Sequence, residues 1–102
     1  MKKIYLIHCE ETNRYKIGVS KTPKKRLQTL QTGNDSEIKL IHEYETKYAY
    51  KIEKSFHNLY SYLKTKGEWF DLDLEFEVNF LNECKRSEET FQYLDKHSTY
   101  NK

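Results

Sequence analysis

Four side chains in the first half of the sequence carry groups that together suit phosphodiester cleavage. Tyr5 supplies a phenol and Lys16 an amine. Arg26 supplies a guanidinium, which can hold two phosphate oxygens and stabilise the charge of the transition state. Glu53 supplies a carboxylate, which can hold a hard divalent cation such as Mg²⁺ or Mn²⁺. The sequence therefore predicts a phosphate-cleaving site, provided that the fold brings these residues together.

Each of these residues also has an ordinary structural interpretation. Tyr5 stands among apolar residues and could pack in the core, and Lys16 could be an exposed strand lysine. Arg26 could lie on a solvated helix face. Glu53 lies within an apolar stripe, directly after Ile52, where a carboxylate is costly unless it forms a salt bridge or binds a metal. We favour the functional interpretation for all four.

The elements that must position these groups begin with a hairpin. Residues 3–9 (KIYLIHC) and 15–20 (YKIGVS) each have the composition of a strand, and the polar residues 10–14 between them predict the connecting loop. Gly18 lies inside the second strand. Its missing side chain either relaxes the strand or lets a substrate backbone approach closely.

A helix is predicted over residues 23–32. Thr22 has the side chain of an N-cap, and Pro23 suits the first helical position. Leu27 and Leu30 fall on one face, and Gly33 is a typical stop. This helix carries Arg26.

The remaining pattern alternates between strand and helix. Residues 37–45 predict a third strand, with Ile38, Leu40, His42 and Tyr44 on one face, and residues 47–64 predict an amphipathic helix that carries Glu53. EWFDL at 68–72 predicts a short extended segment. We expect one helix through Val78, Phe80 and Leu81, another around 88–96, and a fraying end from His97 onward.

The order of these elements and the residues on them resemble the GIY-YIG nuclease family. KIYLI of residues 3–7 corresponds to the family's GIY, and KIG of residues 16–18 to its YIG. Arg26 in KKRL is similar to the family's helix arginine, and Glu53 in KIEKSFH to its metal-binding glutamate. The segments KIGVSKTPKKRLQTLQTGN and GEWFDL resemble a compact phage- and bacterium-associated branch. The resemblance spans about residues 3–72.

This resemblance implies the fold class and a division of the chain. The expected class is α/β, more narrowly α+β, with a small central antiparallel three-stranded sheet flanked by helices. Residues 1–72 would form the nuclease core, and residues 73–102 a C-terminal helical extension of the same domain.

The resemblance also implies an activity, that of a divalent-metal-dependent DNA endonuclease. Tyr5 would be the general base, and Arg26 with Lys16 would stabilise the transition state. Glu53 would be the metal ligand, with Mg²⁺ or Mn²⁺ as the cofactor. Two departures stand out: Lys16 replaces the second signature tyrosine, and no asparagine stands near Gly67 where the family has one.

Further residues surround this predicted site. His57 lies one turn beyond Glu53 and is a catalytic candidate that could contact phosphate or a metal-bound water, or else be a histidine at the edge of the core. The basic side chains before and within the first helix, together with its positive dipole end, suit a phosphate track. The predicted DNA-binding residues are Gly18, Lys21, Lys24 and Lys25.

Composition limits the function less than the charge distribution does. The net charge of +2 is too small to indicate a nucleic-acid binder. However, residues 14–26 carry basic side chains and no acidic one, whereas residues 68–77 carry acidic side chains and no basic one. A surface polarised in this way can hold a polyanion on one side, although a solvated helix face would give the same pattern.

Cysteine spacing and hydropathy predict the compartment. Cys9 and Cys84 have no metal-binding spacing, and the apolar run near the N-terminus is too short for a signal peptide or a membrane span. We therefore expect free thiols in a cytoplasmic protein without membrane contact. The resemblance to the phage-associated branch further implies that a phage or a similar element could encode the protein, which would then act inside the host cell.

Two alternatives to a monomeric nuclease stay open. A non-catalytic module could use the same fold to bind DNA or a protein. A homodimer could place two sites on one duplex, and the protein's lean apolar content also favours association.

Overall fold

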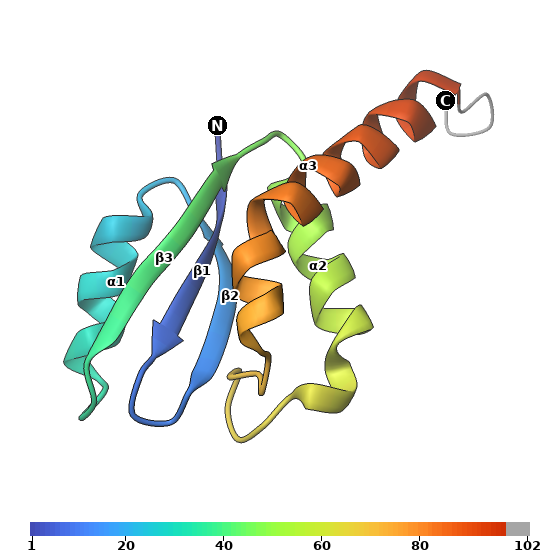
Figure 1. Ribbon diagram of the computed structural model, residues 1–102. Helices are drawn as coiled ribbons and strands as arrows, with labels where there is room; N and C mark the ends of the chain where they lie inside the picture. Colours follow the sequence, from blue (N-terminus) through green and yellow to red (C-terminus); the bar gives the residue numbers. More distant parts are fainter. Residues whose placement is uncertain (98–102) are drawn as a thin grey trace.

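Three antiparallel strands form the sheet on which the fold is built (Figure 1). A computed structural model describes residues 1–97. The strands are β1 (Lys3–Cys9), β2 (Arg14–Ser20) and β3 (Ile38–Glu45), in the order β2-β1-β3. The helices are α1 (Pro23–Thr32), α2 (Ala49–Leu59), the short 3₁₀ turn η1 (Ser61–Leu63) and α3 (Leu74–His97). The predicted α+β class with its three-stranded antiparallel sheet is confirmed.

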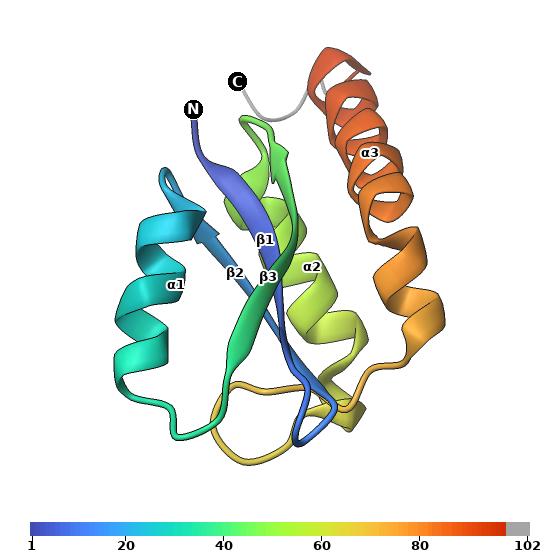
Figure 2. The ribbon, with the colours of Figure 1, turned by 60° about the vertical axis from the view of Figure 1, so that its left-hand side comes forward.

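The sheet separates the helices into two layers. Helix α1 covers one face, while α2 and α3 cover the other (Figures 1 and 2). Successive residues of β1 point to opposite faces, as pleated strands require. Tyr5 and Ile7 pack toward α1, and Ile4 and Leu6 pack into the larger core between the sheet and the other two helices. Each face of the sheet is thus filled, and Tyr5 belongs to the α1 side.

One irregularity in the sheet corrects a prediction about β3. The pairing of β1 with β3 shifts at Leu6 and Ile7, where a bulge adds one residue on β3. Ile38 and Leu40 therefore face α1, whereas Tyr44 packs in the larger core and His42 stacks on Phe80 of α3. The prediction that these residues share one face is wrong, because the bulge reverses the alternation.

Helix α1 begins and ends where the sequence predicts it, but its N-terminus is held differently. Pro23 is buried at the start of the helix. The Thr22 side chain makes no capping hydrogen bond, and the Thr22 amide instead donates to the Ser20 hydroxyl. The predicted Thr22 cap is therefore wrong, while the predicted bounds, 23–32, are confirmed.

The later helices differ from the prediction at their ends. The 47–64 helix is shorter, because the chain leaves α2 at Tyr60 and tightens into η1. The two helices predicted between residues 78 and 96 are one continuous helix, α3. No proline or glycine interrupts this stretch, and Cys84 at its middle is fully buried against the core. The predicted division at residue 72 remains a prediction, and residues 98–102 lie outside the described part of the chain.

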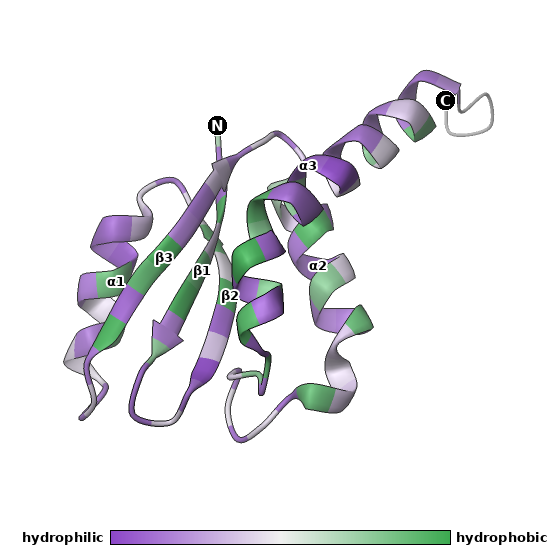
Figure 3. Ribbon diagram, viewed as in Figure 1, coloured by the Kyte–Doolittle hydropathy of each residue, from purple (hydrophilic) through white to green (hydrophobic). Residues whose placement is uncertain are grey.

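Polar contacts fix α3 to the rest of the molecule. Three tyrosine hydroxyls from earlier parts of the chain donate to carboxylates on α3, over 2.6–2.7 Å: Tyr15 to Glu77, Tyr44 to Glu88 and Tyr48 to Asp95. Figure 3 shows apolar residues along the inner parts of the sheet, α2 and the first half of α3, and a more hydrophilic distal part of α3. Within residues 1–97, no helix is long and apolar enough to span a membrane.

Strand β2 lies at one edge of the sheet, and that edge is covered. Tyr15 and Phe70 exchange two backbone hydrogen bonds, of 2.9 and 2.7 Å. Two residues further along β2, the His57 ring donates from Nε2 to the Ile17 carbonyl over 2.9 Å. The segment after η1 and helix α2 therefore both lie against the outer edge of β2.

Candidate functional site

Tyr5 and Gly18 form a tightly fitted pair across the sheet. They are direct partners in the β1–β2 register, on the face toward α1. A Cβ atom at Gly18 would overlap the Tyr5 hydroxyl and the ring carbon that bears it. The absent side chain thus makes room for the Tyr5 ring, which is only 2% exposed. Contact between Gly18 and DNA remains a prediction.

Arg26 extends from α1 to the Tyr5 hydroxyl. Burial raises the pKa of the Tyr5 phenol above its ordinary value, and the Arg26 guanidinium opposes this as a hydrogen-bond partner and through its charge. Smaller contributions from Glu53 and Glu68 raise the pKa further. The Tyr5 phenol of the free protein is therefore protonated, and Arg26 is the group that lowers its pKa.

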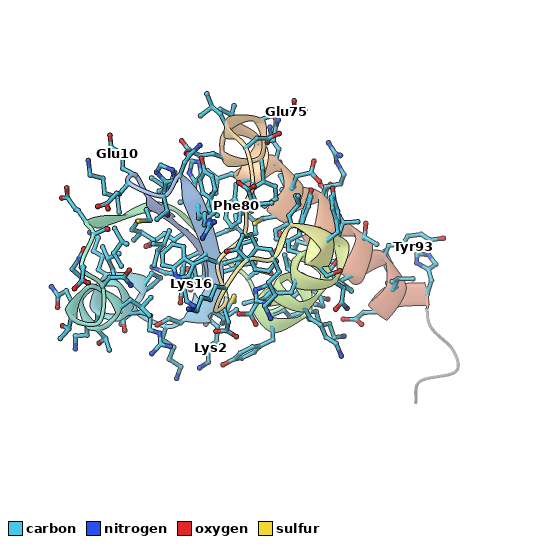
Figure 4. The ribbon with its side chains drawn as sticks, turned by 90° about the horizontal axis from the view of Figure 1, so that it is seen from below. Lys2, Glu10, Lys16, Glu75, Phe80 and Tyr93 are labelled. Atoms are coloured by element: carbon cyan, nitrogen blue, oxygen red, sulfur yellow. The ribbon has the colours of Figure 1, made fainter. Side chains whose placement is uncertain are left out.

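Lys16 lies two residues before Gly18, on the same face of β2. Its ammonium is 3.4 Å from the Glu68 carboxylate and lies 5.9 Å from the centre of the Trp69 ring. Figure 4 shows Lys16 over the sheet, between α1 and α2 in that view. The cation that lowers the pKa of Tyr5 is Arg26, while the Lys16 ammonium is paired with Glu68.

Glu53 and His57 approach from α2, beyond the edge of β2. Burial raises the pKa of Glu53; the nearby His57 and Lys16 lower it, and Glu68 raises it. His57 uses Nε2 for the bond to the Ile17 carbonyl and packs beside the Phe70 ring. This supports the interpretation of His57 as a histidine at the edge of the core. Contact with phosphate, which would need Nδ1, remains a prediction.

Elements far apart in the sequence therefore meet at one place. Tyr5 comes from β1, Arg26 from α1 and Glu53 from α2, and the charges of Arg26 and Glu53 both act on the Tyr5 phenol. Lys16 joins them from β2. The sequence allows Glu68 to bind either Lys16 or the metal, and the structure shows its contact with Lys16. Glu68 is absent from the predicted site residues. The sequence feature that could have identified Glu68 is its position in the GEWF segment, because the chain returns there along the edge of β2.

The remaining basic residues lie near this site but apart from its interior. Lys21, Lys24 and Lys25 are all exposed, at the N-terminal end of α1. Their ammonium groups are free to meet an anion that approaches along this end of the helix, where the helix dipole is positive. Their contact with DNA remains a prediction.

Comparison with known proteins places this site within a family. A family model described as the T5orf172 domain matches residues 2–93. The chain belongs to the T5orf172 domain family. The family is phage-associated and nuclease-like. No curated protein and no solved structure matches the chain.

The match extends from β1 through most of α3, so this T5orf172 domain includes every residue of the candidate site. Among residues 1–97, no three His, Cys, Asp or Glu side chains are grouped so as to hold a metal by themselves. The acidic groups of the site are instead Glu53 and Glu68, which lie near enough for their charges to repel.

Glu53 should reduce the stability of the T5orf172 domain when it is charged. We expect Glu53→Gln to raise the midpoint of thermal unfolding by roughly 2 °C at about pH 7 in metal-free buffer. The reason is that burial raises the pKa of Glu53 in the folded state, so ionisation above the ordinary pKa of 4.5 disfavours folding. Below that value the carboxyl is protonated in both states, and the gain should vanish. Thermal melts at both pH values would measure this.

Glu89→Gln is the matched control, because Glu89 is exposed on α3. It should leave the midpoint unchanged at either pH. A Glu53→Gln protein that melts lower than wild type near neutral pH would show that the charged form of Glu53 is stabilised in the fold.

Proposed function

We propose that this T5orf172 domain is a divalent-metal-dependent DNA endonuclease of the GIY-YIG type. The observation that supports it is the meeting of Tyr5, Arg26 and Glu53 from three separate elements, with Lys16 beside them. A phenol, a guanidinium and a carboxylate close to one another suit phosphodiester hydrolysis.

Arg26 would carry the electrostatic part of the reaction. Its guanidinium is exposed, so a phosphate can reach it, and its fork can hold two phosphate oxygens at once. Negative charge gathers on those oxygens as the attacking oxygen adds to phosphorus. A donor placed in advance at that position stabilises the transition state more than the ground state.

Tyr5 would act as the base. It takes a proton from the attacking water as the new phosphorus–oxygen bond forms and the bond to the leaving oxygen breaks, and the leaving oxygen takes a proton from solvent. Arg26 favours the phenolate that this requires, whereas Glu53 and Glu68 oppose it. Neutralisation of Glu53 by a bound cation would remove one of the opposing contributions.

The carboxylates of the site fit a hard divalent ion. Glu53, with Glu68 nearby, would hold Mg²⁺ or Mn²⁺, and water and substrate phosphate would complete the shell, since one or two carboxylates are a usual protein contribution for such ions. When bound, the ion would neutralise charge on the phosphate and the leaving oxygen. The chain's own residues would position the strand: Lys21, Lys24 and Lys25 beside it, and Lys16 near the scissile phosphate.

The experiment is cleavage of supercoiled plasmid with Mg²⁺ or Mn²⁺. We expect wild-type protein to nick or linearise the plasmid and Glu53→Gln to do so at least about tenfold more slowly. The exposed-residue variant Glu89→Gln should match wild type. If wild type cuts no form of DNA with either metal, and Glu53→Gln alters neither metal nor DNA binding, the proposal is wrong.

A second candidate function is a non-catalytic DNA-binding module. The observation in its favour is that the Lys16 ammonium is engaged with Glu68 and the Trp69 ring instead of being free for phosphate. In that case wild type and Glu53→Gln would bind DNA equally, and neither would cut.

A further inference from the structure

A small polar cavity lies at the far end of β1 from Tyr5, next to the β1–β2 turn. Its volume is about 150 Å³. Buried Cys9 lines it from β1, Arg14 from β2 and Lys66 from the segment after η1. Hydroxyl, amide and indole groups complete the wall, from Thr12, Asn34, Ser36 and Trp69. The cavity is thus built from four separate parts of the chain. Among its polar side chains, Ser36 and Asn34 already donate hydrogen bonds, to the Glu11 carboxylate and the Leu30 carbonyl.

The charges around this cavity favour an anion. Arg14 is half-buried and Lys66 is exposed, and within residues 1–97 neither forms an ion pair. The opposing charge is that of Glu11, whose carboxylate accepts a 2.7 Å hydrogen bond from Ser36. Two cations against one carboxylate leave an excess of positive charge, part of it on a planar fork suited to phosphate oxygens.

The pKa of the Cys9 thiol also indicates hydrogen-bond donors next to this cavity. Burial raises the pKa of Cys9, but hydrogen bonds from the Thr12 side chain and backbone and from the Glu11 backbone outweigh it, and the pKa lies below the ordinary value. The same donors that stabilise a thiolate can stabilise a phosphate oxygen.

The cavity is also connected to the candidate site. Cys9 and Tyr5 lie on the same strand face, four residues apart, which is about 13 Å at about 3.3 Å per residue. Trp69 lies between the two, since its ring is near Lys16 and also lines the cavity. A nucleic-acid strand with one phosphate at Tyr5 would place another near Arg14 a few nucleotides further along.

We propose that this cavity is a second phosphate-binding subsite, which holds a backbone phosphate of the same nucleic-acid strand through Arg14 and Lys66. The inference rests on the proposed function only in that the candidate site must bind DNA; it does not require cleavage. The subsite would fix the direction and register of the nucleic-acid strand relative to the candidate site.

The test compares two matched double variants in DNA binding. Arg14→Gln/Lys66→Gln removes the cations of the cavity. Arg86→Gln/Lys85→Gln removes the same charges from α3, where both residues are exposed. The probe is a short fluorescein-labelled DNA, single-stranded and duplex, and the measurement is anisotropy over a range of NaCl concentrations. Thermal melts of both variants ensure that folded proteins are compared.

We expect the cavity variant to bind about tenfold more weakly than the control variant at about 0.1 M NaCl. Its slope of log affinity against log salt should be smaller by about one for each phosphate that the variant no longer neutralises. In a series of oligonucleotides with one neutral methylphosphonate each, one position should weaken binding of wild type and leave the cavity variant unaffected.

The results distinguish failure of the proposed subsite from failure of the proposed endonuclease. If both double variants have the same salt slope and affinity, the subsite is refuted while DNA binding stands. If wild type binds these oligonucleotides but does not cut, only the endonuclease is refuted. If wild type binds no DNA, both proposals fail.

Discussion

Arg26→Gln is expected to lower the single-turnover rate of DNA cleavage by about 10²–10³-fold, the usual cost of losing one preorganised donor to a transition-state oxyanion. Two effects combine in this variant. The fork that would hold the phosphate is lost, and so is the charge that lowers the pKa of Tyr5. Removal of that charge raises the pKa of Tyr5 further, so the rise of the rate with pH should shift to more alkaline values.

Two variants separate these effects from a general loss of charge. Lys25→Gln removes the neighbouring exposed cation and should reduce the rate only slightly. Arg26→Lys keeps the charge but not the fork, so it should recover the pH profile more than the rate. An Arg26→Gln protein that cleaves at the wild-type rate would exclude Arg26 from the reaction.

Gly18→Ala should destabilise the protein by about 2 kcal/mol, which corresponds to a fall of roughly 10 °C in the midpoint of thermal unfolding for a domain of this size. The added methyl group would overlap the Tyr5 hydroxyl and ring, and the ring is buried and cannot turn away into solvent. Differential scanning calorimetry of the metal-free protein measures the effect, and the displaced phenol should also reduce cleavage.

Gly33→Ala is the matched control. The nearest atom to a Cβ at Gly33 is 3.9 Å away and its φ is −93°, so alanine fits without strain. Combining Gly18→Ala with Tyr5→Leu should cost less than the sum of the two single changes, since the overlap is gone. If Gly18→Ala and Gly33→Ala melt alike, the close fit of Tyr5 on Gly18 is not a constraint on the fold.

Local signals account for the parts of the fold that could be predicted. The hairpin of β1 and β2 follows from two apolar strands around a polar turn, and α1 from Pro23 at its start and Gly33 at its end. These signals lie within a few residues of the elements they define, so no knowledge of the rest of the chain is needed.

The incorrect parts depend on contacts between distant residues. The bulge opposite Leu6 and Ile7 arises from how β3 pairs with β1, which no pattern within β3 reveals. Similarly, α2 ends early because Lys64 and the residues after it fold back to pair with Phe70. Helix α3 is continuous because its middle is packed on the core at Cys84, although the sequence there is mostly polar.

The residues of the candidate site could be named from the sequence more readily than the contacts that they make. Residue type and spacing selected Tyr5, Arg26 and Glu53, which the fold brings together. The sequence offers Glu68 as a partner of either Lys16 or the metal but cannot choose between them, because Glu68 is 52 residues away and reaches Lys16 only when the segment after η1 returns along β2.

The covered edge of β2 limits the ways in which another chain could add a strand to the sheet. An unpaired strand edge offers a row of backbone groups onto which another chain can add, a common route to aggregation. On β2 the Phe70 backbone and the His57 ring already occupy such groups. Growth of the sheet is thereby directed to β3, where Lys39, Glu43 and Glu45 place charges along the strand. The residues that close the site beside β2 therefore also protect the protein from edge-to-edge polymerisation.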